Sequence, residues 1–184
     1  MFHWQTGSEV VYFNSHFDTA SLAQIRINIY DHYSDDGKTI RPDRRGLAGT
    51  WLDSGVNALS LLKCWLPFDE VSYLGGEVVR CEDSGLPIFT DLQFRMDGRA
   101  VRVTVDWRTA ESAKYTELTA ADGKRILIEH TKQTLIFPDG SVALDDMLRL
   151  ERHYYNYFVT LSDGFDPDGE QKIHKVLFEV NQSL

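Results

Sequence analysis

Three Asp-Gly pairs limit the fold of this chain more than any other feature of its sequence. They stand at Asp97-Gly98, Asp122-Gly123 and Asp139-Gly140. Asp-Gly between two runs of alternating apolar and polar residues is a strong signal for a tight β-hairpin, because both turn positions favour a positive φ. Such runs flank the first pair, at residues 88–96 and 101–107. The sequence therefore predicts an antiparallel meander in the middle of the chain.

Two different periods mark the segments before the meander. Residues 24–33 and 71–81 alternate between apolar and polar side chains, which is typical of strands. Between them, residues 47–66 repeat apolar side chains every three to four positions. That spacing predicts an amphipathic helix, which Pro67 ends.

The two ends of the chain favour helices. Residues 147–161 and 173–180 carry helical patterns, whereas residues 9–13 fit either a helix or a strand. Together with the strands, these segments predict one α+β domain over residues 1–184. We expect a large, mostly antiparallel sheet of about six or seven strands, with helices packed on one face.

The alternation leaves the other face of the predicted sheet polar. Antiparallel sheets often expose such a face to water. The same face could instead bury against a second subunit, and both interpretations stay open at this point. Its side chains are those of Asp91, Gln93, Arg95, Arg102, Thr104, Asp106 and Arg108.

Charge and composition exclude several kinds of partner. The net charge of −9 would repel a phosphate backbone, so we expect no nucleic acid. No apolar run approaches the roughly 20 residues that span a bilayer, and the first ten residues lack the pattern of a signal peptide, so we expect no membrane. Cys64 and Cys81 lack the spacing of metal ligands, and two buried free thiols are typical of a cytoplasmic protein.

Motifs that bind cofactors are missing from the sequence. It contains no G-x-G-x-x-G, no Walker loop, no H-E-x-x-H and no G-x-S-x-G. Its six histidines include no pair three or four positions apart, as a helical metal site would need. We therefore expect neither a dinucleotide-binding domain, nor a bound cofactor, nor a metal on this chain.

The start of the predicted central helix carries the most informative polar residues. Asp53 and Asn57 are four positions apart, hence on one side of a helix, directly after several glycines. A carboxylate and an amide placed in this way could bind the hydroxyl groups of a polyol. The alternative is that Asp53 only caps the helix and Asn57 is exposed to water.

This segment resembles the signature of the Gfo/Idh/MocA family, which includes glucose–fructose oxidoreductases and inositol dehydrogenases. The family motif is G-x-x-x-D-x-G-x-H before an apolar helix. Here it reads Gly49-Thr50-Trp51-Leu52-Asp53-Ser54-Gly55-Val56-Asn57. The strand before the loop, the Asp-Gly hairpins and residues 152–158 resemble the family as well, but less specifically.

The resemblance implies that this chain is the C-terminal domain of such an oxidoreductase. In the family that domain binds a sugar, cyclitol or related polyol and mediates oligomerisation, and we expect a homo-oligomer formed through the open sheet face. NAD or NADP would then be bound only by a separate Rossmann domain. Asp53 matches the catalytic Asp of the family motif, and Asn57 stands where the family has His.

The presence of Asn57 where the family has His matters for catalysis, since an amide cannot accept a proton near neutral pH. Asn57 could orient a hydroxyl group, while a Lys of the Rossmann domain takes its proton, or the chain no longer catalyses. His32 could replace the missing His in space, or it is an ordinary surface residue. Arg41, Arg44 and Arg45 could meet an acidic substrate or a cofactor phosphate, or they belong to a solvated loop.

Two classes of function follow from this reading. In the first, the chain is the substrate-binding and oligomerisation domain of an NAD(P)-dependent oxidoreductase and is catalytically incomplete alone. In the second, it is a non-catalytic binding or scaffold module that self-associates. A hydrolase that pairs Asp53 with Asp31 or Glu77 has only loose carboxylates in its favour. The candidate catalytic residue is Asp53, and the candidate substrate-binding residues are Asp53, Asn57, Arg45, Arg41 and His32.

Overall fold

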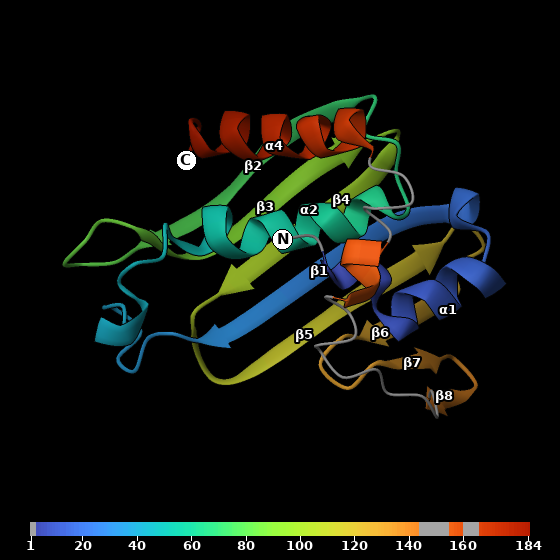
Figure 1. The fold of residues 1–184 in the computed structure, drawn as a ribbon, viewed down its shortest axis with the longest axis horizontal. Coiled ribbons are helices and arrows are strands. Elements are labelled where there is room, and N and C mark those ends of the chain that lie inside the picture. Colours follow the sequence, from blue (N-terminus) through green and yellow to red (C-terminus); the bar gives the residue numbers. More distant parts are fainter. Residues whose placement is uncertain (1–2, 144–154, 160–165) are drawn as a thin grey trace.

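The computed structural model describes residues 3–143, 155–159 and 166–184, and these residues build one eight-stranded sheet (Figure 1). The strand order is β2-β3-β4-β1-β5-β6-β7-β8, and every neighbouring pair is antiparallel except β1 with β4. The strands are β1 (Leu22–His32), β2 (Val71–Arg80), β3 (Pro87–Met96), β4 (Arg99–Asp106), β5 (Arg108–Ala120), β6 (Arg125–Glu129), β7 (Thr134–Phe137) and β8 (Gly140–Ala143).

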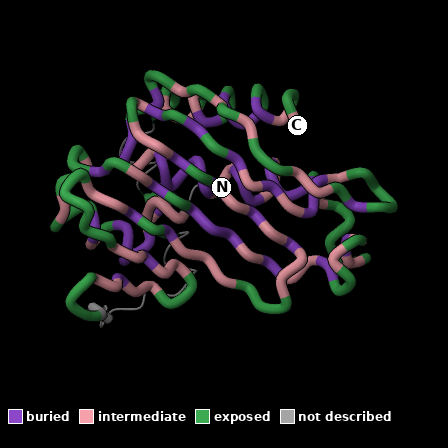
Figure 2. The backbone as a smooth tube through the Cα atoms, turned by 180° about the vertical axis from the view of Figure 1, so that it is seen from behind, coloured by how far each residue is buried: buried purple, intermediate pink, exposed green. Residues whose placement is uncertain are grey.

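The helices lie on one face of the sheet (Figure 1), and no described helix covers the opposite face in the view from behind (Figure 2). The predicted fold class is therefore confirmed, and the described sheet has eight strands. No helix among the described residues is long and apolar enough to cross a membrane. The helical segments are η1 (His3–Thr6), α1 (Ser8–His16), η2 (Thr19–Ser21), η3 (Pro42–Arg44), η4 (Trp51–Gly55), α2 (Val56–Lys63) and α4 (Pro167–Asn181).

The predictions at the two ends of the chain have different outcomes. The ambiguous segment at residues 9–13 belongs to helix α1, and the pattern at residues 173–180 belongs to α4. Residues 155–159 are helical, and the remainder of the helix predicted at 147–161 lies outside the described residues.

All three Asp-Gly pairs lie between antiparallel strands, as predicted. They connect β3 to β4, β5 to β6 and β7 to β8. At the first of these turns Asp97 and Gly98 both adopt a positive φ, of 47° and 79°. The Asp97 carboxylate also accepts hydrogen bonds from the backbone N–H groups of Phe68 and Glu70, at 2.9 and 3.0 Å, and so ties the turn to the chain that enters β2.

Strand β1 comes first in the chain but lies in the middle of the sheet. Its residue Ile27 pairs with Val103 of β4 in parallel and with Thr116 of β5 in antiparallel fashion. The chain passes directly from β4 to β5 through Trp107, around the carboxyl end of β1. There the N–H groups of Tyr33 and Ser34 both donate to the Trp107 carbonyl, at 3.0 and 2.9 Å. This arch holds the end of β1 in place.

The central helix begins later than predicted and contains a π-helical turn. It runs from the π-turn η4 directly into α2 and ends at Lys63. Gly49 precedes it with a φ of +90°, and a Cβ there would lie 2.8 Å from Cδ of Pro87, so only glycine fits. The predicted helix bounds of residues 47–66 are therefore too wide by about two turns in total.

The π-turn also changes which side chains face the sheet. The expected buried stripe included Leu52 and Val56, but both are only half-buried, because an extra residue in the turn rotates the helix. Ser60, expected on the same side as Asp53, is fully buried, and its hydroxyl donates to the Asn57 carbonyl at 2.7 Å. The buried residues of the segment are Trp51, Ser54, Gly55, Ala58, Leu59, Ser60, Leu61 and Leu62.

Trp51 fixes the position of this helix. Its ring is fully buried and stacks on Phe94 of β3 at a centroid distance of 5.9 Å. Its indole N–H donates to the carbonyl of Leu177 at 2.9 Å, which joins η4 to α4. A Cβ on Gly55 would lie 2.5 Å from the Trp51 ring. The glycine two positions after Asp53 therefore makes room for this tryptophan.

Candidate functional site

Asp53 lies half-buried in the π-turn, where its carboxylate belongs to a short chain of hydrogen bonds. The hydroxyl of the buried Ser54 donates to the Asp53 carboxylate at 3.2 Å. The indole N–H of the buried Trp107 lies 3.4 Å from the Ser54 hydroxyl oxygen and donates to it. Thr50 precedes the turn, and no side chain caps it. The interpretation of Asp53 as a helix cap is therefore wrong, and its carboxylate is open to another role.

The surroundings of Asp53 favour its protonated form. Burial is the largest cause that raises its pKa above the ordinary value near 3.8, and the charge of Asp31 acts in the same direction. The hydrogen bond from Ser54 and the positive charges of Arg44 and Lys114 partly oppose this. A carboxylate whose pKa is raised in this way accepts a proton more readily at neutral pH than an exposed one.

The part-buried ion pair of Asp31 and Lys114 lies on the same side of the sheet. Asp31 follows the inward-facing residues Ile27 and Ile29 of β1, and Lys114 of β5 pairs in register with Ile29. The Lys114 ammonium donates to the Asp31 carboxylate at 2.5 Å, and the Asp31 side chain is only 8% exposed. Lys114 thus forms its ion pair with Asp31, while its positive charge acts on Asp53 only from a distance.

Tyr33 and Arg44 complete the group at the end of β1. The Arg44 guanidinium lies over the Tyr33 ring, 4.8 Å from its centroid, and that ring packs on Trp107 at 5.2 Å. Burial raises the pKa of Tyr33, Asp31 acts in the same direction and Arg44 opposes it. We call these five residues the edge cluster: Asp31, Tyr33, Arg44, Asp53 and Lys114.

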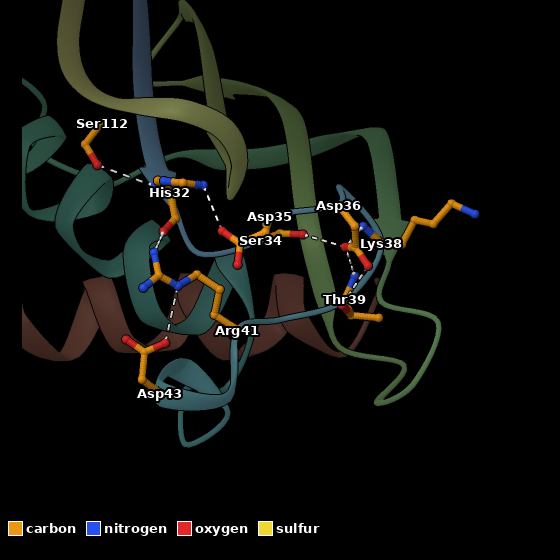
Figure 3. Close-up of polar contacts among 9 residues, drawn as sticks. All are labelled: His32, Ser34, Asp35, Asp36, Lys38, Thr39, Arg41, Asp43 and Ser112. Carbon is orange, nitrogen blue, oxygen red and sulfur yellow. Dashed lines mark hydrogen bonds and ion pairs between the residues drawn. The ribbon is translucent and has the colours of Figure 1, made fainter.

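Of the predicted site residues, His32 and Arg41 shape the loop after β1 (Figure 3). His32 alternates with Asp31 along β1 and so points to the opposite side of the sheet, where its Nε2 lies 3.1 Å from the Asp35 carboxylate. One Nη of Arg41 donates to the His32 carbonyl at 3.4 Å, and its Nε lies 3.3 Å from Asp43. The structure therefore does not place His32 next to Asp53.

Arg45 and Asn57 have different surroundings. Arg45 points to the turn between β2 and β3, where it pairs with Asp83 at 3.6 Å, so the structure does not bring it into the edge cluster. Asn57 follows Asp53 by one helical turn and is half-buried, and its side chain makes no hydrogen bond to the described residues. An amide in this state is available to a ligand that also contacts Asp53.

Sequence reasoning did not identify Lys114 or Tyr33 as site residues. The alternation before the Asp122-Gly123 turn predicts a strand only from Tyr115 onwards, whereas β5 begins at Arg108 and includes Lys114 on its inward side. The signal that Lys114 belongs to the site is a lysine at an inward-facing position of a strand, paired in register with Ile29. Glu77, named as a possible partner of Asp53, pairs in register with Asp91 on the uncovered face of the sheet.

Three of the described helix starts carry a carboxylate in or next to their first turn. A pyrophosphate needs free N–H groups at the positive end of a helix dipole. Glu9 lies in the first turn of α1, Asp53 lies in η4, and the Asp166 carboxylate accepts the N–H of Gly169 at the start of α4, at 3.0 Å. These three starts thus carry a carboxylate that would repel a phosphate.

The fold is one found in dehydrogenases, although the sequence itself matches no known protein family and no curated protein. UDP-N-acetylglucosamine 3-dehydrogenase from Acidithiobacillus ferrooxidans is similar with a TM-score of 0.74 and 10% identity, over 99% of this chain and 60% of that chain. A Gfo/Idh/MocA family oxidoreductase from Vibrio cholerae gives 0.65 and 12%, over 100% and 61%. A myo-inositol dehydrogenase from Corynebacterium glutamicum gives 0.63 and 14%, over 94% and 58%.

These similarities establish the fold. The chain has the fold of a large part of the Gfo/Idh/MocA oxidoreductases, and it spans about 60% of the length of the structures that it matches. The resemblance seen in the helix motif is thus confirmed at the level of structure.

The raised pKa of Asp53 gives a test that needs no ligand. The folded protein holds a proton on Asp53 more tightly than the unfolded chain, so this group stabilises the fold below its ordinary pKa near 3.8, and that stability is lost as the pH rises through the folded value. We expect Asp53→Asn to increase the free energy of unfolding at pH 7, and to do so less towards pH 4. Urea unfolding over this range measures the difference, and a variant less stable at pH 7 would contradict the interpretation.

Proposed function

We propose that this chain is the substrate-binding domain of an NAD(P)-dependent oxidoreductase that acts on a sugar, cyclitol or related polyol. The observation that carries the proposal is the Asp53 carboxylate, which is half-buried, caps no helix and is held by Ser54 at 3.2 Å. Similar folds occur in proteins described as a UDP-N-acetylglucosamine 3-dehydrogenase and a myo-inositol dehydrogenase. Substrates of that kind present several hydroxyl groups, which suit a carboxylate beside an amide.

In this proposal each residue has a distinct task. Asp53 accepts a hydrogen bond, and then the proton, from the substrate hydroxyl that is oxidised, while the Asn57 amide orients a neighbouring hydroxyl. Lys114 keeps Asp31 neutralised, so that Asp31 does not compete for the substrate. Arg41 fixes the backbone of the loop through the His32 carbonyl. NAD or NADP belongs to a separate Rossmann domain, so the chain alone is catalytically incomplete.

A cytoplasmic location is part of the same proposal. Cys64 and Cys81 are free thiols. Burial raises the pKa of the Cys64 thiol to about 12, which keeps it in the unreactive protonated form. Free thiols and a thiol that stays protonated both suit a reducing compartment.

Binding of a neutral polyol tests the proposal directly. We expect myo-inositol or glucose to bind the chain in the millimolar range or tighter, and Asp53→Ala to abolish this binding because the hydroxyl acceptor is lost. Calorimetric titration or ligand-observed NMR measures it. Asp122→Ala, in the exposed turn between β5 and β6, is the matched control. Equal binding by the two variants would contradict the proposal.

A separate observation supports a second candidate function, self-association through the uncovered sheet face. Asn28 lies on this face but is only 9% exposed, and its side-chain Nδ2 has no hydrogen-bond partner among the described residues. Beside it, the rings of Tyr30 and Tyr115 meet edge to face at 5.7 Å, and their hydroxyls are 3.3 Å apart. Rigid aromatic side chains around a buried polar group are typical of an interface.

Sedimentation at micromolar concentration tests self-association. We expect a dimer or larger assembly, which Arg26→Glu weakens because it reverses a charge within the uncovered face. Lys175→Glu on the exposed side of α4 makes the same charge change away from this face and leaves the assembly intact. A monomer with wild-type sequence, or equal effects of both variants, would rule out this interface.

A further inference from the structure

The three arginines of the loop after β1 differ in the contacts that their guanidinium groups make. Arg41 donates to the His32 carbonyl and pairs with Asp43, and Arg45 pairs with Asp83 through a terminal nitrogen. The Nε of Arg44 lies 3.3 Å from the Asp43 carboxylate. Its two terminal nitrogens make no hydrogen bond to the described residues. Arg44 therefore keeps the forked pair of donors that recognises carboxylates and phosphates.

The position of Arg44 connects it to Asp53. Its guanidinium lies on the Tyr33 ring, which packs on Trp107, and Trp107 donates to Ser54 beside Asp53. Stacking on Tyr33 holds the guanidinium plane, so less freedom is lost when a ligand binds.

The charges of the edge cluster separate into two ends. Asp31 and Lys114 pair with each other at 2.5 Å, which leaves the Asp53 carboxyl group at one end and the Arg44 guanidinium at the other. The single carboxylate of Asp43 is shared by Arg41 and Arg44, so the Arg44 end keeps an excess of positive charge. An anionic group is repelled next to Asp53 but attracted at Arg44.

We propose that the substrate is a polyol with an anionic substituent, a carboxylate or a phosphate, which Arg44 binds while a hydroxyl group contacts Asp53. This inference rests on the proposed function and names the substrate class of the same site. The anionic group and the hydroxyl that reacts are different parts of the substrate, because Asp53 and Arg44 lie at the two ends of the chain of contacts through Tyr33 and Trp107.

Calorimetric titration of the full chain with four probes tests this assignment: glucose, glucuronate, glucose 6-phosphate and inorganic phosphate. We expect glucuronate or glucose 6-phosphate to bind about tenfold tighter than glucose, since a charged hydrogen-bonded pair is added. The preference for one of the two identifies the anionic group. Arg44→Met removes the advantage of the anionic sugars over glucose, whereas Arg45→Met keeps it.

The possible failures are distinguishable. If glucose and both anionic sugars bind equally well and all depend on Asp53, the inference is overturned while the proposed function stands. If no sugar shows binding that depends on Asp53, the proposed function fails and the inference fails with it. Inorganic phosphate that binds as tightly as glucose 6-phosphate, with or without Asp53, identifies an anion site alone and overturns the inference. Arg44 is exposed at the surface, so thermal unfolding should show that its variants remain folded.

Discussion

Replacing Lys114 by Met is expected to lower the free energy of unfolding by about 3–5 kcal/mol, because it leaves a buried carboxylate without its partner. The Asp31 side chain is 8% exposed, and the Lys114 ammonium is its ion-pair partner at 2.5 Å. Loss of the positive charge would also raise the pKa of Asp53 further. Urea unfolding at pH 7, followed by circular dichroism, measures the effect on stability.

Two further variants separate this effect from a general loss of charge. Lys132→Met removes an exposed lysine that pairs with Glu129 at 3.2 Å, and such a surface pair contributes at most about 1 kcal/mol. The double variant Asp31→Leu/Lys114→Met removes both charges of the pair and should recover most of the lost stability. If Lys114→Met and Lys132→Met have the same small effect, the pair does not stabilise the folded state in the manner described.

Replacing His130 by Leu should destabilise the fold by a similar amount, about 3–5 kcal/mol, because it isolates a second buried carboxylate. His130 and Glu9 have side chains that are 4% and 3% exposed, and His130 Nδ1 lies 2.9 Å from Glu9. The other ring nitrogen lies 2.8 Å from the Thr116 hydroxyl. Helix α1 is thus attached to β5 and β6 through this imidazole.

The Trp4 ring provides a local signal for this variant, since it lies 5.5 Å from the His130 ring. We expect its fluorescence and the hydrogen exchange of α1 to change together in His130→Leu. His16→Leu, which alters an exposed histidine at the end of the same helix, is the control. Unchanged exchange in α1 despite lower global stability would show that the pair does not hold this helix.

The sequence was sufficient to predict the meander because its signals are local. Each Asp-Gly turn specifies the pairing of the two strands that flank it, and the alternation specifies which side of each strand is buried. The insertion of β1 between β4 and β5 has no such signal, since it pairs residues far apart in the chain. The π-turn was missed for another reason: its extra residue is set by the packing of Trp51 against Phe94 and Gly55, not by helical periodicity.

The candidate site also has one part that the sequence predicts and one part that it does not. Asp53 and Asn57 belong to one short motif and were identified from it. Lys114 and Tyr33 belong to the site only through the register of β1 with β5 and the packing around Trp107. His32 was assigned by its proximity in sequence to the loop, but strand alternation directs it to the other face.

The arch at Trp107 has a consequence for the order in which the protein folds. Strands β4 and β5 are consecutive in the chain, yet β1 separates them in the sheet. Both strands pair with β1, which precedes β4 by more than 60 residues. Neither can complete its pairing until β1 lies between them. Pairings with such large separations in sequence slow the search for the native state. The two outer groups of hairpins can form early and locally, and the entry of β1 between them is then the step that completes the sheet and, at its carboxyl end, the edge cluster.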